Sequence, residues 1–260
     1  MKYLFVIGSH RTGSKLLANF FNEKCPSTKG VHQYAQLQWN NIFTNMHLTG
    51  MMSEVQLFDK LNQKWVQKLQ KLDDLNYNLY VESNGFNYFA VSLFLKELNS
   101  PYVIHSIRDP RTSIVSHMNW IKGRRKSKIA NYLVPFWNLN GSYLNQFKRI
   151  EWIRLPFVEK LMYNWAWKNE IISNLYSENP TYLLVRLEDI TNPIKAPKVV
   201  DEIGELINKQ FPKESYKYFN EKQNQSSNEY FPEFSKWDAD LQNKLYEICG
   251  NQMRNYNYHR

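Results

Sequence analysis

The sequence has few of the features that mark secreted, metal-binding or membrane-spanning proteins. Its 260 residues include only two cysteines, Cys25 and Cys249, too few for a disulfide framework or a cysteine-based zinc site, so we expect two reduced thiols. The longest apolar run near the start, residues 3–7, is shorter than a signal-peptide core of about 7–15 residues or the roughly 20 that span a bilayer. We therefore expect a cytoplasmic protein with no transmembrane segment. Repeats, low-complexity tracts and Gly/Ser linkers are also missing, which predicts a single domain over residues 1–260.

Charge and composition describe a basic, folded chain. Lys and Arg total 33 against 24 Asp and Glu, a formal net charge of +9. With 43% hydrophobic and 15% aromatic residues the sequence is far from the composition of disordered chains. The positive charge favours an anionic partner, and nucleic acid, a membrane surface, a nucleotide and an acidic sugar all satisfy that condition.

Short apolar segments alternate with helical patterns along the chain. We expect strands at residues 3–7, 79–82, 102–107 and 182–186, and helices that include residues 53–72, 197–210 and 239–254. Such alternation predicts an α/β fold, a three-layer sandwich with a mostly parallel central sheet. Ligands of these folds bind beyond the carboxyl ends of the strands.

The first loop of interest, GSHRTGSK at residues 8–15, joins the first strand to a helix. The unpaired N–H groups at the start of that helix attract anions, Gly8 and Gly13 allow a tight backbone path, and Arg11 and Lys15 add positive charge. The nucleoside-triphosphatase motif needs Gly-Lys-Ser/Thr after four intervening residues, but here Ser14 precedes Lys15. The loop therefore suits a phosphate or sulfonate and argues against an ATP- or GTP-dependent kinase.

The second loop begins with Arg108 directly after the strand at residues 102–107. Asp109 suits a helix cap and Pro110 a first helical position. Ser116 follows Arg108 by eight residues, about two helical turns from the loop. A guanidinium and a hydroxyl placed in this way can grip one phosphate together.

These two loops, in this order, resemble the motifs of sulfotransferases that use 3′-phosphoadenosine 5′-phosphosulfate (PAPS). The segment VRLED at residues 185–189 and the C-terminal residues from Trp237 onward are similar to bacterial members. The resemblance implies a P-loop NTPase-like sulfotransferase fold and sulfuryl transfer to a hydroxyl, or less often an amine, of a carbohydrate, lipid-linked glycan or small metabolite. The 5′-phosphosulfate would lie against Arg11, Thr12, Gly13, Ser14 and Lys15. Arg108 and Ser116 would hold the 3′-phosphate, which stays in the product PAP.

Sulfuryl transfer needs in-line positioning, stabilisation of charge on the departing bridge oxygen and a base for the acceptor hydroxyl. Arg11 is the candidate for the departing oxygen, and the cationic loop carries charge that magnesium carries in kinases, so no metal is required. Two residues are candidates for the base. His32 lies shortly after the first helix, beside Gln33, which cannot accept the proton; Glu82 ends the strand at residues 79–82. The sequence ranks them equally.

A polyanion-binding module without catalysis is the rival interpretation, although nucleic acid is not the expected partner. The run KGRRKSK at residues 122–128 has five basic residues of seven. It is typical of a solvated loop, and it also suits peripheral contact with a membrane or an anionic acceptor. The acceptor-binding loops are expected at residues 32–52 and 122–155, and their sequences name no acceptor.

Overall fold

The computed structural model describes residues 1–33, 38–72, 77–122, 136–220 and 230–259. By their contacts these residues form two compact units, and the chain passes between the units several times. The single-domain expectation stays a prediction. The first unit comprises Met1–Leu37, Leu61–Arg108 and Ile171–Gln225, and the second comprises Gln38–Lys60, Asp109–Glu170 and Ser226–Arg260.

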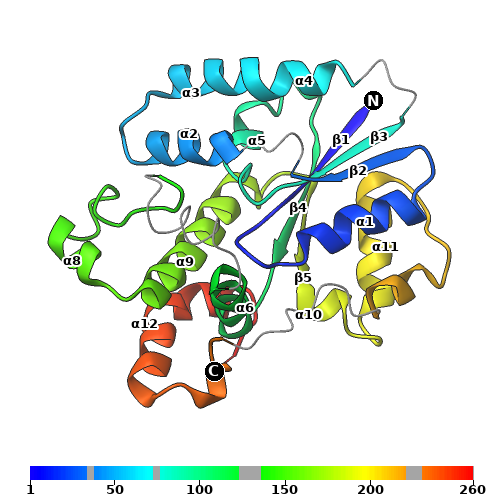
Figure 1. Cartoon of the computed structure of the whole chain (residues 1–260). Coiled ribbons are helices and arrows are strands. Elements are labelled where there is room, and N and C mark those ends of the chain that lie inside the picture. The colour runs from blue at the N-terminus through cyan, green and yellow to red at the C-terminus, as the bar shows by residue number, and fades with distance from the viewer. Residues whose placement is uncertain (34–37, 73–76, 123–135, 221–229, 260) are drawn as a thin grey trace. The chain divides into compact units, whose positions relative to one another are not determined.

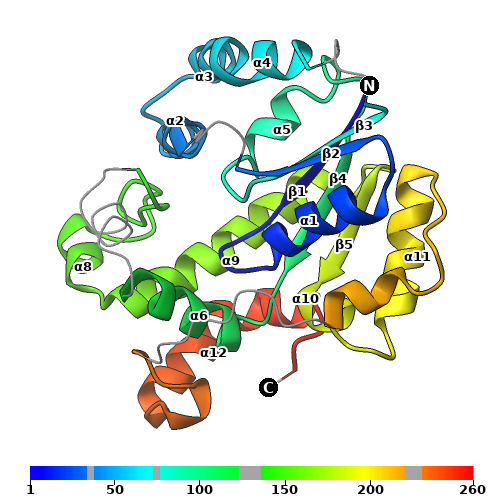
Figure 2. The same cartoon turned by 45° about the vertical axis from the view of Figure 1, so that its right-hand side comes forward.

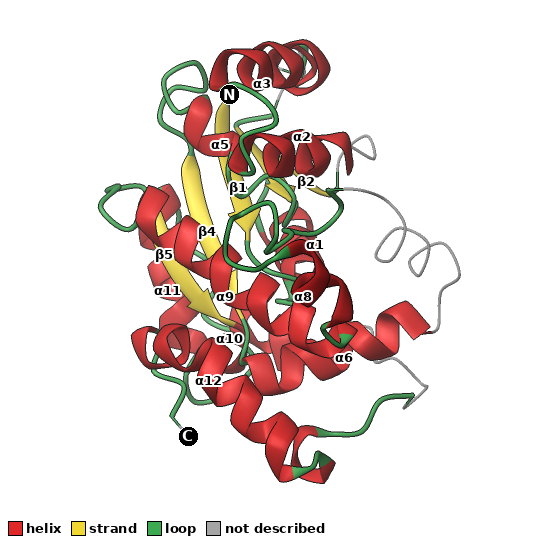
Figure 3. Cartoon of the chain, turned by 90° about the vertical axis from the view of Figure 1, so that its left-hand side faces the viewer, coloured by secondary structure: helices red, strands yellow, loops and turns green. Residues whose placement is uncertain are grey.

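A five-stranded sheet forms the centre of the first unit. All paired strands are parallel and their order is β2-β3-β1-β4-β5 (Figures 1 and 3). The direction of winding changes at β1, which lies between β3 and β4, so the loops after β1 and β4 meet where α/β sheets bind their ligands. The strands are β1 (Lys2–Ile7), β2 (Thr28–His32), β3 (Leu79–Ser83), β4 (Tyr102–Ile107) and β5 (Tyr182–Arg186).

Four of these strands match the sequence prediction, and β2 was missed. Its sequence, TKGVH, is short, half polar and interrupted by Gly30. A Cβ at Gly30 would lie 2.3 Å from the carbonyl oxygen of Ala18, so glycine allows β2 to approach helix α1 (Ser14–Lys24). The Asn22 side chain also donates to the Gly30 carbonyl at 2.6 Å and accepts from its N–H at 2.7 Å. Contacts with the preceding helix thus stabilise a strand that its own residues do not favour.

One face of the sheet packs against α1 and α11 (Ala196–Ile207), which lie on the same side of the strands (Figure 2). Alternate residues of β1 point to this face because side chains alternate along a strand. Each fully buried aliphatic or aromatic side chain contributes about 1.5–3 kcal/mol. This core includes Leu4, Val6, Leu17, Phe20, Phe21, Val81, Ile104, Val185, Val200 and Ile203.

The opposite face of the sheet is covered by aromatic side chains. Phe5 lies edge-on to Trp65 at 5.4 Å between ring centroids, and Trp65 in turn lies edge-on to Phe94 at 6.2 Å. Trp65 belongs to η2 (Asn62–Val66), a π turn between α3 (Glu54–Leu61) and α4 (Gln67–Gln70). The helix predicted over residues 53–72 is therefore confirmed, with a widened turn at Trp65 where its indole enters the core. Short α5 (Ala90–Leu93) follows β3.

The second unit is helical. Its tryptophans Trp137, Trp152 and Trp165 are buried and belong to its core. Asp109 caps α6, because its carboxylate accepts a hydrogen bond from the backbone N–H of Arg111 at 2.8 Å. The helix begins at Pro110, as expected. The described helices of this unit are α2 (Gln38–Leu48), most of α3, α6 (Pro110–Lys122), α8 (Arg149–Arg154), most of α9 (Phe157–Tyr176), η4 (Phe234–Lys236) and α12 (Ala239–Asn255). The short helices α10 (Leu187–Ile190) and η3 (Ser215–Asn220) belong to the first unit.

Candidate active site

The loop between β1 and α1 has the backbone of an anion-binding turn. Arg11 and Gly13 both adopt left-handed conformations, with φ of 63° and 82°. Gly13 is the N-cap of α1 and has no side chain with which to cap it, so the first N–H groups of the helix are not satisfied from that position. A Cβ on Gly13 would also lie 2.5 Å from Leu187, the first residue of α10. The turn therefore presents backbone N–H groups and the positive end of an 11-residue helix to a ligand.

Gly8 lies too close to β4 to carry a side chain. A Cβ there would lie 2.1 Å from the Ser106 carbonyl oxygen, which is backbone and cannot rotate away. We expect Gly8→Ala to push β1 and β4 apart and to lower the free energy of unfolding by about 1–3 kcal/mol. Urea unfolding measures this change. Gly250→Ala is the control, because its Cβ meets only Arg254 at 3.6 Å within α12, where alanine should slightly stabilise the helix. Equal effects of the two substitutions would contradict the close approach.

The end of β4 is hydrogen-bonded to the first loop. The Ser106 hydroxyl donates to the Thr12 carbonyl oxygen at 2.5 Å, and Arg108 Nη1 donates to the Arg11 carbonyl oxygen at 3.3 Å. Both arginine side chains are half-buried, whereas Lys15 is exposed at the start of α1. The tertiary structure thus brings Arg108 to the loop that holds Arg11, although nearly a hundred residues separate them in the sequence. Ser116 lies on α6 in the second unit, and its part in the site stays a prediction.

His32 is the last residue of β2 and lies near the cations of the first loop. Its Nδ1 lies 3.3 Å from the Ser83 hydroxyl, and these two residues face each other in the β2–β3 register. Partial burial lowers the pKa of His32, the nearby Lys15 and Arg11 lower it further, and a hydrogen bond with the Ser83 backbone opposes them. A neutral imidazole near neutral pH follows, which is the form that accepts a proton.

The side chain of Glu82 is buried on the face of the sheet opposite to that of His32. It is fully buried and accepts hydrogen bonds from Trp65 Nε1 at 3.0 Å, Asn87 Nδ2 at 2.9 Å and Asn84 Nδ2 at 3.3 Å. It precedes Ser83, which pairs with His32, and successive side chains of a strand point to opposite faces. His32 and Glu82, equal candidates in the sequence, therefore lie on opposite sides of the sheet. Gln33 is exposed, and its N–H donates to the Ser83 carbonyl at 3.0 Å.

The burial of Glu82 should be visible in the pH dependence of stability. Burial raises the pKa of Glu82 to about 7, despite three donated hydrogen bonds that lower it. The folded chain therefore holds a proton that the unfolded chain, with a carboxyl pKa of about 4.3, has already released. The stability contributed by this proton is complete below that value and is lost as the pH rises through about 7.

We therefore expect the parent to lose more stability than Glu82→Gln when the pH is raised from about 5 to about 8. Urea unfolding of both proteins at the two pH values measures the difference. Glu97→Gln, at an exposed glutamate, is the control and should keep the pH dependence of the parent. A Glu82→Gln protein with the same pH dependence as the parent would show that Glu82 is ionised in the fold throughout this range.

Sequence reasoning missed two serines in the site. Ser9 is 6% exposed and its hydroxyl has no hydrogen-bond partner within the part of the chain that the structure describes. A buried hydroxyl of this kind needs a water or ligand partner. Its place between Gly8 and Gly13 is the signal that could have identified it. Ser83 had no local signal, because only strand pairing brings it to His32.

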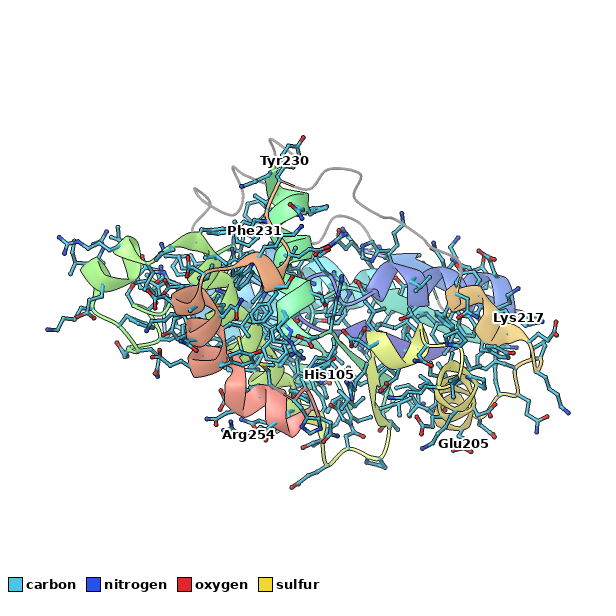
Figure 4. All side chains as sticks on the ribbon, turned by 90° about the horizontal axis from the view of Figure 1, so that it is seen from below. His105, Glu205, Lys217, Tyr230, Phe231 and Arg254 are labelled. Atoms are coloured by element: carbon cyan, nitrogen blue, oxygen red, sulfur yellow. The ribbon has the colours of Figure 1, made fainter. Side chains whose placement is uncertain are left out.

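The basic run at residues 122–128 is only partly described. Lys122 ends α6, donates to the Tyr230 carbonyl oxygen at 2.9 Å and lies 5.6 Å from the centroid of the Phe231 ring; Figure 4 labels both aromatic residues. Residues 123–128 lie outside the described residues, so contact of this run with a membrane stays a prediction. Among the described helices none is both long and apolar enough to cross a membrane. No group of three or more His, Cys, Asp or Glu side chains in the described ranges is arranged to hold a metal ion.

Comparison with known structures identifies the fold. The chain is similar to a sulfotransferase from Alicyclobacillus acidocaldarius, with a TM-score of 0.56, 10% identity and coverage of 100% of this chain and 96% of that one. It is also similar to the sulfotransferase domain of the olefin synthase of Synechococcus PCC 7002, with a TM-score of 0.52, 14% identity and coverage of 97% and 94%. Neither models of protein families nor curated sequences match the chain. The sulfotransferase fold implied by the sequence motifs is thus confirmed.

Proposed function

We propose that this protein transfers a sulfuryl group from PAPS to the hydroxyl group of an acceptor. The observation that supports the proposal is the hydrogen bond from Arg108 to the carbonyl oxygen of Arg11. It joins the two arginine-bearing loops after β1 and β4, beside the strand at which the direction of winding changes, in a chain with a sulfotransferase fold. The cytoplasmic location and the preference for a hydroxyl over an amine stay predictions of the sequence.

The residues of the first loop suit the anionic end of the donor. Backbone N–H groups at the start of α1, the half-buried Arg11 and the exposed Lys15 supply positive charge, and the Ser9 hydroxyl supplies a buried hydrogen-bonding group. In this proposal Thr12, Gly13 and Ser14 line the same turn, as the resemblance implies. Arg108 provides the fork for the 3′-phosphate, because a guanidinium binds two phosphate oxygens at once.

When bound, PAPS supplies the sulfuryl group, and PAP leaves with the electron pair of the broken S–O bond. Arg11 stabilises the negative charge that develops on the departing bridge oxygen, since its guanidinium belongs to the loop that holds the phosphate. The acceptor oxygen forms the new S–O bond, and its proton passes to the base.

We propose His32, rather than Glu82, as that base. The imidazole is neutral near neutral pH, lies on the face of the sheet nearer Arg11 and Lys15, and keeps an exposed edge. The hydrogen bond of its ring with Ser83 uses Nδ1 and leaves Nε2 to accept the proton of the acceptor hydroxyl. Glu82 is enclosed and its oxygens already accept three hydrogen bonds, so its role in this proposal is to hold the turn after β3.

Thermal unfolding with PAP, compared with ATP plus magnesium at the same concentration, tests the proposal. A ligand at a hundred times its dissociation constant stabilises the fold by about 2.7 kcal/mol, enough to raise Tm by a few degrees. We expect a shift with PAP that exceeds the shift with ATP and magnesium. A larger shift with ATP and magnesium, or none with PAP, would refute the donor assignment and favour the kinase or polyanion-binding interpretations.

A further inference from the structure

Exposed large apolar side chains gather in the second unit. Of the eight such side chains among the described residues, only Ile194 belongs to the first unit. Single exposed apolar residues are normal on a protein surface, whereas neighbours that share one face indicate a contact surface. Ile150 and Ile153 are neighbours of this kind, because they are 54% and 59% exposed and lie three positions apart on α8.

The other side of α8 fixes the helix so that this pair faces outward. Trp152 is buried, and its ring centroid lies 5.4 Å from that of Phe147 and 5.7 Å from that of Trp167. Lys160 Nζ lies 5.7 Å from the Trp152 ring centroid and donates to the Ile153 carbonyl oxygen at 3.2 Å. Turning α8 to bury the isoleucines would expose Trp152 and break these contacts.

Two arginines flank the isoleucine pair. Since successive residues of an α-helix are about 100° apart, Arg149 and Arg154 lie about 70° to either side of the midline of the pair. Both arginines are exposed, and their side chains form no ion pair with the described residues. Glu151, the one acidic residue of α8, lies about 130° from that midline and accepts the backbone N–H of Lys148 at 2.9 Å. The outward face of α8 is therefore apolar with a positive rim.

This face suits the surface of an anionic phospholipid membrane. Aliphatic side chains insert at the boundary between headgroups and acyl chains, while the long side chains of arginine keep their charged ends at the level of the phosphates. The positive rim is complementary to the negative charge of such a surface. A protein partner fits less well, because a stable protein interface buries about 800 Å² on each side, far more than two isoleucine side chains expose.

From this arrangement we infer that α8 docks on an anionic phospholipid surface. Ile150 and Ile153 insert at the headgroup boundary, and Arg149 and Arg154 bind lipid phosphates. This contact differs from the one expected for the basic run at residues 122–128. The inference goes beyond the proposed function, because it depends on neither the sulfuryl donor nor the acceptor.

The double substitution Ile150→Ser and Ile153→Ser tests the apolar part of this contact, since serine has nearly the helix propensity of isoleucine. Ile194→Ser is the matched control, at an isoleucine that is 89% exposed in the first unit. The probes are vesicles of phosphatidylcholine alone and of phosphatidylcholine with an equal amount of phosphatidylglycerol. Co-sedimentation gives the partition coefficient, and Tm without vesicles shows whether each variant is folded.

We expect the parent to bind the vesicles that contain phosphatidylglycerol and not those of phosphatidylcholine alone. The double substitution should lower the partition coefficient at least about tenfold with an unchanged Tm, and Ile194→Ser should leave it unchanged. Binding of the double variant as strong as that of the parent would overturn the inference and assign the attachment to another basic surface. A parent that binds neither kind of vesicle would overturn it as well.

The charged rim has its own test. Arg154→Gln should lower the partition coefficient about fivefold, because each basic residue near an anionic surface contributes to binding. Lys68→Gln removes the same charge from an exposed position of α4 in the first unit and should have no effect. Equal effects of the two substitutions would show that net charge alone attracts the protein and that α8 is not the docking site.

A fluorescent label locates the contact directly. Cys25 and Cys249 are both buried, so a maleimide dye that is sensitive to its surroundings labels an added surface cysteine selectively. We expect the dye on Ile150→Cys to shift its emission to the blue with vesicles that contain phosphatidylglycerol, and the dye on Ile194→Cys to show no shift. A parent that forms dimers without lipid, together with a double variant that does not and no blue shift with vesicles, would overturn the inference in favour of a second copy of the chain.

Discussion

Replacing His32 with alanine is expected to lower kcat by about 10²–10⁴-fold, the range for loss of a general base. The physical reason is that the acceptor proton then has no neutral imidazole to receive it, while the groups that hold the donor are intact. Affinity for PAP should therefore stay close to that of the parent. Steady-state transfer of labelled sulfuryl groups measures kcat, and titration calorimetry with PAP measures binding.

The pH profile of kcat supplies a second test of His32. The imidazole must be neutral to act, and its pKa lies below its usual value because partial burial and the cations Lys15 and Arg11 disfavour the charged form. Activity should therefore rise with pH and reach half its maximum below about 6.5, the ordinary pKa of histidine. His47→Gln is the control, because that histidine bonds through Nδ1 to the Met52 carbonyl oxygen in the second unit. An unchanged kcat in His32→Ala would move the base to another residue.

Replacing Arg108 with alanine is expected to weaken PAP binding by about 10²–10³-fold, the effect of removing one partner of a partly buried charge pair. The side chain also donates to the Arg11 carbonyl oxygen, so its loss should loosen the first loop as well as remove the phosphate fork. Titration calorimetry with PAP measures the change, and circular dichroism checks that the fold is retained.

Two further variants separate charge from geometry at Arg108. Arg149→Ala removes the same charge from an exposed position at the start of α8 and should leave PAP affinity unchanged. Arg108→Lys keeps the charge without the planar fork and should recover only part of the affinity. PAP binding by Arg108→Ala as tight as by the parent would show that the 3′-phosphate binds elsewhere.

Local sequence patterns predicted most of the sheet because its central strands are buried on both faces. β1 and β4 are short continuous apolar runs, which is how a strand of a parallel sheet covered by helices appears in a sequence. The cationic loops at their ends were likewise visible as glycines, arginines and hydroxyl residues next to those runs. Because parallel strands end at the same edge of a sheet, the predicted fold class already put both loops at the edge where ligands bind.

Other features depended on contacts that no local pattern encodes. β2 forms because Gly30 fits against Ala18 and pairs with Asn22, and the π turn at Trp65 forms where its indole packs on Phe5 and donates to Glu82. α2 also contains buried asparagines, which were missed for the same reason. Asparagines in a helix are ordinarily exposed, and only the carbonyls of residues 136 and 137 explain two of them.

The choice between His32 and Glu82 as the base separates what the sequence determines from what only the tertiary structure determines. The sequence alone determined the parallel α/β fold, the cationic loop at residues 8–15 and the arginine at the end of β4, because each follows from residue order within one short segment. Only the tertiary structure decided that His32 lies near Arg11 and Lys15 while Glu82 is enclosed on the other side. Strand pairing sets that difference, since the β2–β3 register aligns His32 with Ser83 and the alternation of side chains then turns Glu82 away.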